Sequence, residues 1–165
     1  MKRFIIFLLV SFCFLASCDD KNSEGRKVTV EFEYKKFNTE KTLWNSDSPS
    51  NYQYNLEYWN TGFSTPVNTL IFVENGQYKN QIPQENHEST FYLTITDVYN
   101  YINELYLQYN NTTQDKNKYY LKKIIIKYDE AHHIPIEIYE YYQVPANLAD
   151  AASYCETKIT QYKIN

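Results

Sequence analysis

The sequence of 165 residues predicts an α+β fold: an antiparallel β-sheet of about five or six strands, packed against one long amphipathic helix and a short N-terminal helix. Several segments alternate apolar and polar residues, as half-buried strands do. Two hairpins are expected, around Asn75-Gly76 and around His132-His133. Between them, residues 94–109 repeat apolar side chains with a period near 3.6, which indicates a helix.

The first half of the domain alternates strand patterns with one short helix. Residues 28–34 alternate and predict a half-buried strand, with an extended continuation of the N-terminal segment as the alternative. Residues 37–44 predict a short helix, and residues 51–58 predict a strand with tyrosines on one face. Residues 67–73 and 78–82 are the expected arms of the first hairpin, because Asn-Gly accepts the positive φ angles of a tight turn.

The second half begins with the expected long helix, about 94–109. Thr94 and Asp97 have the spacing of a helix cap. Residues 122–128 and 134–138 then alternate as two strands. A helical turn is expected at 146–152, followed by a last edge strand over 153–163.

The N-terminus has the layout of a bacterial lipoprotein signal. A short basic start precedes an apolar run, and Leu15-Ala16-Ser17-Cys18 matches a lipobox, in which Cys18 is lipidated and becomes the new N-terminus. The alternative, a membrane-spanning anchor, needs roughly 20 apolar residues, more than the run provides. Residues 1–17 are therefore expected to be a removed signal peptide, 18–27 a flexible lipidated tether and 28–165 a single α+β domain. The expected location is the bacterial cell envelope, on the periplasmic side or the outer surface.

Charge and composition exclude several classes of function. The chain has 16 basic and 20 acidic side chains; loss of Lys2 and Arg3 with the signal peptide leaves 14 and 20, a formal charge of −6. No basic field is present for nucleic acid. Three glycines leave no phosphate-binding loop, and no nucleophile motif is found. We therefore expect neither an enzyme nor a cofactor. Cys155, the cysteine left after Cys13 is removed and Cys18 lipidated, is expected to be a packed thiol.

The order of these motifs resembles a lipoprotein family known only as domain of unknown function 6174. The matching segments are Trp44 with Ser50–Tyr54, then Val73–Gln77, Leu93–Tyr99, Ile126–Asp129, Ile134–Ile138 and Ala146–Asp150. The resemblance implies a fold and a lipid anchor, and it carries no agreed activity.

Two positions depart from the pattern of that family. A cysteine pair that the family commonly carries is replaced by Trp59–Gly62, and its glycine turn before the last hairpin is replaced by Ala131-His132-His133. Histidine enters the left-handed region more easily than most residues, so we expect the turn to form.

Three side chains near this turn are weak candidates for metal binding. Asp129, His132 and His133 are metal-ligand types, but neighbouring histidines on a tight turn point to different sides. A solvated turn is the favoured interpretation, and no metal is expected.

The remaining candidates for function are aromatic. Tyr139 and Tyr141 project from the face opposite Ile138, and Trp59 or Tyr119 is expected near the same rim. Such side chains offer large contact area at low entropy cost, which suits a protein or glycan partner. The alternative is a second covered face, packed by the N-terminal segment. The sequence therefore predicts a lipid-anchored, non-catalytic domain that binds a protein or an envelope component, with a glycan-binding module, or less favourably a metal-binding module, as alternatives.

Overall fold

The computed structural model describes residues 26–62, 64–82, 94–114, 119–145 and 153–165. The elements run in the order β1 (Arg26–Lys27), α1 (Tyr34–Asp47), β2 (Tyr52–Asn60), β3 (Val67–Glu74), β4 (Gln77–Ile82), α2 (Ile95–Tyr109), β5 (Thr113–Gln114), β6 (Tyr120–Asp129), β7 (Ile134–Gln143) and β8 (Tyr154–Ile164). The signal peptide, Cys18 and the helical turn expected at 146–152 lie outside the described residues.

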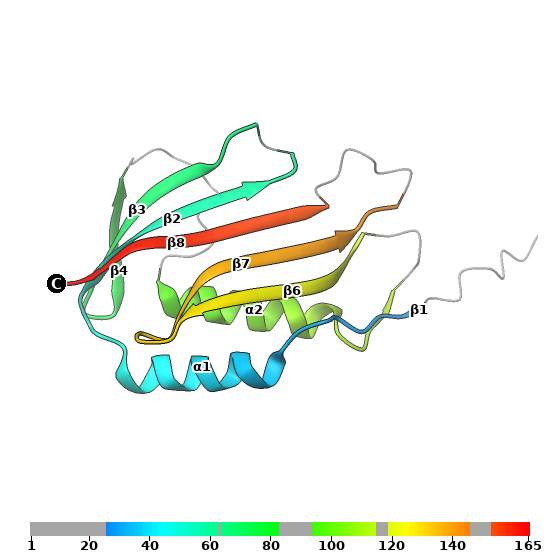
Figure 1. Cartoon of the computed structure of the whole chain (residues 1–165), viewed down its shortest axis with the longest axis horizontal. Helices are drawn as coiled ribbons and strands as arrows, with labels where there is room; N and C mark the ends of the chain where they lie inside the picture. The colour runs from blue at the N-terminus through cyan, green and yellow to red at the C-terminus, as the bar shows by residue number, and fades with distance from the viewer. Residues whose placement is uncertain (1–25, 63, 83–93, 115–118, 146–152) are drawn as a thin grey trace, which may run out of the picture.

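A six-stranded antiparallel sheet forms the centre of the molecule, with the strand order β4-β3-β2-β8-β7-β6 (Figure 1). Together with two helices it gives the mixed α+β architecture that the sequence predicts. The short strands β1 and β5 pair separately. One expectation was wrong: β8 was placed at an edge, yet it lies between β2 and β7, because strand pairing depends on topology and not on local pattern.

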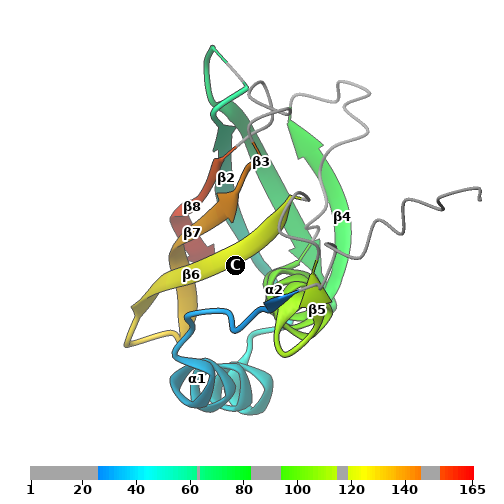
Figure 2. The same ribbon diagram turned by 90° about the vertical axis from the view of Figure 1, so that its right-hand side faces the viewer.

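The helices lie close to each other, and the sheet curls around α2 (Figure 2). Helix α2 buries Ile95, Val98, Tyr99 and Ile102, and α1 buries Phe37 and Trp44. With 15 residues in α2 and 14 in α1, the expectation of one long helix beside a short one is not confirmed. Among the described residues, neither helix has the length and apolarity needed to span a membrane.

Polar side chains fasten α1 to α2. The Trp44 indole N–H donates to Thr96 Oγ1 at 3.1 Å, and the Lys41 ammonium donates to Asn100 at 2.9 Å. At the other end, the Tyr34 ring stacks on Tyr106 with centroids 4.4 Å apart. The buried aromatic side chains thus hold both helices against one face of the sheet.

The two turns form as their residues predict. Asn75 and Gly76 have φ angles of 54° and 72°, the signs required by a tight hairpin between β3 and β4. His133 has a φ of 56° and closes the hairpin of β6 and β7. A histidine therefore occupies the left-handed region without loss of the hairpin.

Residues 28–33 do not form the strand that their alternation predicts. Val28 and Val30 are buried, but the segment makes one parallel bridge, between Glu31 and Lys123. Helix α1 then begins at Tyr34, three residues before the predicted start, without a side-chain cap at Glu33. The alternation reflects burial against the body of the domain and not pairing within the sheet.

Candidate functional site

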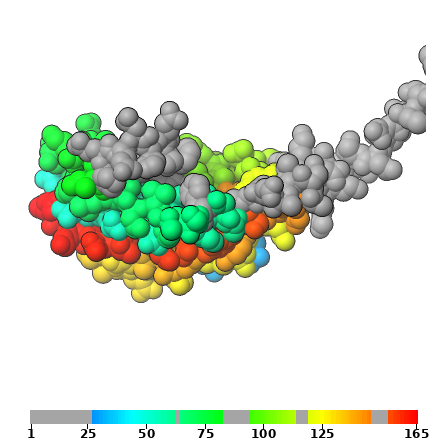
Figure 3. All heavy atoms as spheres, turned by 90° about the horizontal axis from the view of Figure 1, so that it is seen from above, coloured from blue at the N-terminus to red at the C-terminus, as the bar shows by residue number. Residues whose placement is uncertain are grey.

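The sheet face opposite α2 carries the aromatic residues singled out from the sequence. Side chains alternate across a strand, so Ile138 and Glu140 point inward while Tyr139 and Tyr141 point outward. On β8, Cys155 and Thr157 are buried and Tyr154 lies on the outward face. Figure 3 shows that atoms of β8 (red) reach the molecular surface between β2–β3 (green) and β6–β7 (orange and yellow). No described helix covers this face.

Four outward rings form one cluster, which we call the aromatic patch: Trp59, Tyr139, Tyr141 and Tyr154. Tyr154 is its centre. Its ring centroid lies 5.1 Å from Tyr141, 5.8 Å from Trp59 and 6.1 Å from Tyr139. Tyr141 is the most open member, with 37% of its surface exposed. The structure thus brings together all three candidates from the sequence.

Paired charges border the aromatic patch. Lys158 on β8 lies 2.9 Å from Glu156 and 3.7 Å from Glu57 of β2. Lys127 lies 2.6 Å from Glu137 and also sits over the Tyr139 ring, 5.7 Å from its centroid. Each of the three carboxylates therefore has a lysine partner, and the border presents alternating charge without a dominant sign.

These contacts also fix the ionisation of the patch. The hydrogen bond with Lys127 holds the pKa of Glu137 below its ordinary value, and a second bond from Tyr139 acts the same way. The bond to Glu137 raises the pKa of Tyr139 to about 12. Burial, followed by the charge of Glu156, raises the pKa of Tyr154 to about 12. Both hydroxyls are protonated at neutral pH; Tyr139 already donates its proton to Glu137, whereas the Tyr154 hydroxyl can donate a hydrogen bond to a partner.

The described part of the N-terminal segment does not cover the aromatic patch. Val28 bonds with Asn111 and Thr112 beyond the end of α2, and Glu31 bonds to the outer edge of β6. Residues 26–33 therefore follow the side of the domain and not its outward face. They give no support to the alternative in which the N-terminal segment covers the tyrosines.

Sequence reasoning missed Tyr154 and misplaced Tyr119. Tyr154 was assigned to an edge strand, although the alternation of Tyr154, Glu156 and Lys158 could have placed it on an outward face. Tyr119 stacks on Tyr142 with centroids 4.6 Å apart, on the inner side of the sheet. It does not join the aromatic patch.

A buried polar cluster lies behind the patch, on the inner side. Glu140 is 2% exposed and accepts hydrogen bonds from Tyr142 at 2.5 Å and Tyr101 at 3.2 Å. Burial raises its pKa. Cys155 lies opposite Glu140 on the neighbouring strand, 3.7 Å from the Tyr58 hydroxyl, and burial raises the pKa of its thiol to about 11. The thiol is thus protonated at neutral pH and a poor nucleophile.

The structure does not bring the three weak metal candidates together. His132 lies 2.9 Å from Asp129, whereas His133 turns toward α1 and lies 2.8 Å from Glu40. The hydrogen bond with His132 lowers the pKa of Asp129. Within the described residues, no group of three or more histidine, cysteine or acidic side chains is placed to hold a metal ion. The Glu40–His133 pair, missed from the sequence, joins α1 to the hairpin turn.

The outward face presents packed rings, protonated hydroxyls and paired charges on neighbouring strands. This face offers contact area and hydrogen bonds. The Cys155 thiol and the buried Glu140 lie on the opposite side of the sheet. No protein-family model, curated protein or solved structure matched this chain. The resemblance to domain of unknown function 6174 therefore stays a prediction, and the function is argued from the site.

Proposed function

We propose that this protein is a non-catalytic, lipid-anchored protein of the bacterial envelope, which binds a protein partner through the aromatic patch. One observation carries the proposal: Trp59, Tyr139 and Tyr141 gather around Tyr154 on a sheet face that no described helix covers. Tyrosine and tryptophan are enriched at the centres of protein interfaces, where they provide large apolar area with few rotatable bonds.

The border of the patch favours a protein partner. Three carboxylates and two lysines alternate around the rings, and interfaces commonly combine an aromatic centre with such a polar rim. A non-catalytic role agrees with the chemistry of the domain, because the Cys155 thiol has a pKa of about 11 and lies behind the sheet.

The lipid anchor is supported by the lipobox Leu15-Ala16-Ser17-Cys18 and by the family resemblance. Attachment by two or more acyl chains gives stable membrane binding, whereas one chain holds only marginally. Growth with labelled palmitate tests it: the wild-type protein is expected to carry label and to sediment with membranes. Label retained in Cys18→Ala would refute this part of the proposal without touching the binding face.

The binding face is tested by a matched pair of variants. Tyr139→Ser with Tyr141→Ser is expected to abolish capture of the cross-linked partner from intact cells. Tyr78→Ser is the control, because Tyr78 on β4 has the same 37% exposure as Tyr141 but lies outside the patch. Equal capture by both variants, with folding verified by circular dichroism, would remove the patch from the proposal.

A glycan partner is the competing outcome, since aromatic rings on a flat face also stack on sugars. A glycan array separates the two: saturable binding lost in the double tyrosine variant would assign the patch to a carbohydrate. Capture of one defined protein, unaffected by glycosidase treatment, is the result that our proposal expects.

A further inference from the structure

The outer edge of β6 is only partly paired. β6 is the last strand of the six-stranded sheet, so its second edge has no neighbouring strand of that sheet. One bridge covers part of this edge: Glu31 donates its N–H to the Lys122 carbonyl at 2.9 Å, and Ile124 donates its N–H to the Glu31 carbonyl at 3.0 Å. After Glu31 the segment leaves the edge and turns into α1.

Beyond this bridge, main-chain groups of β6 remain open among the residues that the structure describes. The N–H and C=O of one strand residue point to the same edge, and the edge alternates between successive residues. Because Ile124 faces Glu31, its carbonyl and both main-chain groups of Ile126 point to the outer edge as well. Ile125 and Lys127, which alternate with them, face β7. Within the described residues, the outward groups of Ile126 have no hydrogen-bond partner.

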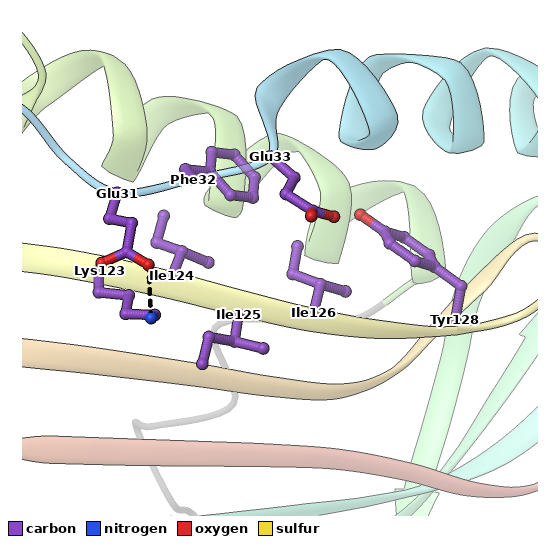
Figure 4. A pocket seen from close by; sticks show the side chains of 8 residues that line it. All are labelled: Glu31, Phe32, Glu33, Lys123, Ile124, Ile125, Ile126 and Tyr128. Carbon is purple, nitrogen blue, oxygen red and sulfur yellow. Dashed lines mark ion pairs between the residues drawn. The ribbon is translucent and has the colours of Figure 1, made fainter.

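A pocket of about 410 Å³ opens on this stretch of edge (Figure 4). Ile124, Ile126 and Phe32 supply apolar walls, and Ile124 is 3% exposed. The volume lies within the range of ligand sites, about 300–1,000 Å³. It suits a few residues of peptide, because α1 begins directly above it and blocks a longer strand.

The Glu33 carboxylate marks one end of the pocket. Figure 4 shows the Glu33 carboxylate and the Tyr128 hydroxyl pointing toward each other across the opening. At the other end, Glu31 is neutralised by Lys123 at 2.5 Å. The Lys36 ammonium lies over the Tyr128 ring, 5.6 Å from its centroid, but among the described residues Glu33 forms no ion pair, so its carboxylate is left to pair with a cation of a ligand.

The chain itself shows how the edge is used. The segment at Glu31 forms main-chain hydrogen bonds with Lys122 and Ile124 of β6, directly before the open groups of Ile126. A second copy of β6 is a poor occupant, since its edge carries the same covering segment. A small molecule would leave the alternating donor and acceptor of Ile126 only partly used, whereas an extended peptide matches both.

We propose that the β6 edge binds a short extended peptide of a partner protein, which pairs with Ile126 through its main chain and places a lysine or arginine side chain against Glu33. This site is separate from the aromatic patch, on the edge of the sheet and not on its face. It does not depend on the proposed function.

The experiment uses three synthetic peptides on the mature protein, followed by amide NMR. The first is acetyl-Thr-Val-Lys-Val-Thr-amide, the second has glutamate in place of lysine, and the third is the lysine peptide with N-methylated valines. The lysine peptide is expected to shift the Ile126 amide saturably and to slow its hydrogen exchange. N-methylation removes main-chain donors and should abolish these effects.

Matched acidic variants test the charge. Glu33→Gln is expected to weaken the lysine peptide about tenfold, the loss of one charge-assisted hydrogen bond. The Glu33 side chain makes no cap bond to α1, so this change leaves the helix start intact. Glu104→Gln, on the exposed side of α2, is the control and should bind as the wild type does.

The charge-reversed Glu33→Lys variant should prefer the glutamate peptide. The proposal is overturned if no peptide shifts the Ile126 amide saturably, if the lysine and glutamate peptides bind the wild type equally, or if the shifts map to the aromatic patch. Equal losses in Glu33→Gln and Glu104→Gln would also overturn it.

Discussion

Tyr154 lies directly opposite Tyr141 across the β7–β8 pairing, with ring centroids 5.1 Å apart, although twelve residues separate them in the chain. This pair joins the last strand of the chain to the preceding hairpin and makes Tyr154 the centre of the aromatic patch. A residue that sequence patterns assigned to an edge thereby holds the proposed binding surface together.

We predict that Tyr154→Ala destabilises the domain by about 1–2 kcal/mol, because it removes three ring contacts that each contribute roughly 0.2–1 kcal/mol. Tyr78→Ala, which removes an equally large ring from the exposed strand β4, should cost less than about 0.5 kcal/mol. Urea unfolding followed by circular dichroism measures both. Equal losses in the two variants would show that the rings around Tyr154 do not stabilise one another.

Two neighbouring tyrosines on β2 should respond differently to loss of the hydroxyl. The Tyr52 hydroxyl accepts the N–H of Ile95 at 3.1 Å, at the start of α2. Tyr52→Phe leaves that buried donor without its partner and should cost about 1–2 kcal/mol. The buried Tyr54 hydroxyl has no hydrogen-bond partner among the described residues, so Tyr54→Phe should be neutral or stabilising.

Differential scanning calorimetry of the two phenylalanine variants checks this pair. The expected order of melting temperature is Tyr54→Phe at or above the wild type and Tyr52→Phe below it. The reverse order would mean that the hydroxyl of Tyr52 does not support the first turn of α2.

Glu140 should make stability depend on pH. Its folded pKa is raised by burial, more than the bonds from Tyr142 and Tyr101 lower it. Between the unfolded and folded pKa values, the folded state holds a proton that the unfolded chain has released, so the free energy of unfolding falls as pH rises. Asp129 and Glu137, whose pKa values are lowered, act in the opposite direction: their contribution is lost as pH falls.

The variant Glu140→Gln isolates this effect, because an amide oxygen still accepts from both tyrosines. Urea unfolding at a series of pH values above about 4, the ordinary range for a glutamate, compares it with the wild type. The free energy of unfolding of the variant, relative to that of the wild type, should rise with pH and then level off. A constant difference between the two proteins would contradict the raised pKa.

Cys155 is predicted to be unreactive in the folded protein. Its thiol has a pKa of about 11 and the residue is 8% exposed, so the thiolate is scarce and poorly accessible at pH near 8. Labelling with a disulfide reagent should be slow in buffer and fast in denaturing urea. Rapid labelling of the folded chain would instead point to an accessible, activated thiol.

Local sequence signals predicted which helices, strands and turns form better than they predicted which elements pair or pack against one another. Asn75 and Gly76 specify a turn by their own backbone preferences, and Thr94 marks the start of α2 through a side-chain cap bond to Asp97. Helix α1 begins at Tyr34, and the preceding Glu33 makes no such cap bond, so no local signal placed its start. The alternation of residues 28–34 was misinterpreted because burial against another element gives the same pattern as a sheet.

The candidate site was predictable only in part. Tyr139 and Tyr141 were singled out from their alternation, and Trp59 only as one of two residues expected near the same rim. Tyr154 and the edge pocket at Glu33 depend on which strands pair and which strand ends the sheet. Pairing between β2 and β8 joins segments about a hundred residues apart, and no local pattern specifies it.

The central claim is that the aromatic patch contacts a protein in the envelope. The most direct measurement places a photo-cross-linking phenylalanine analogue at Tyr141 or, as the control, at Tyr78, and irradiates intact cells. The account predicts a defined protease-sensitive product from position 141 that position 78 does not give and that Tyr154→Ala weakens. The same products from both positions, or none from position 141, would contradict it.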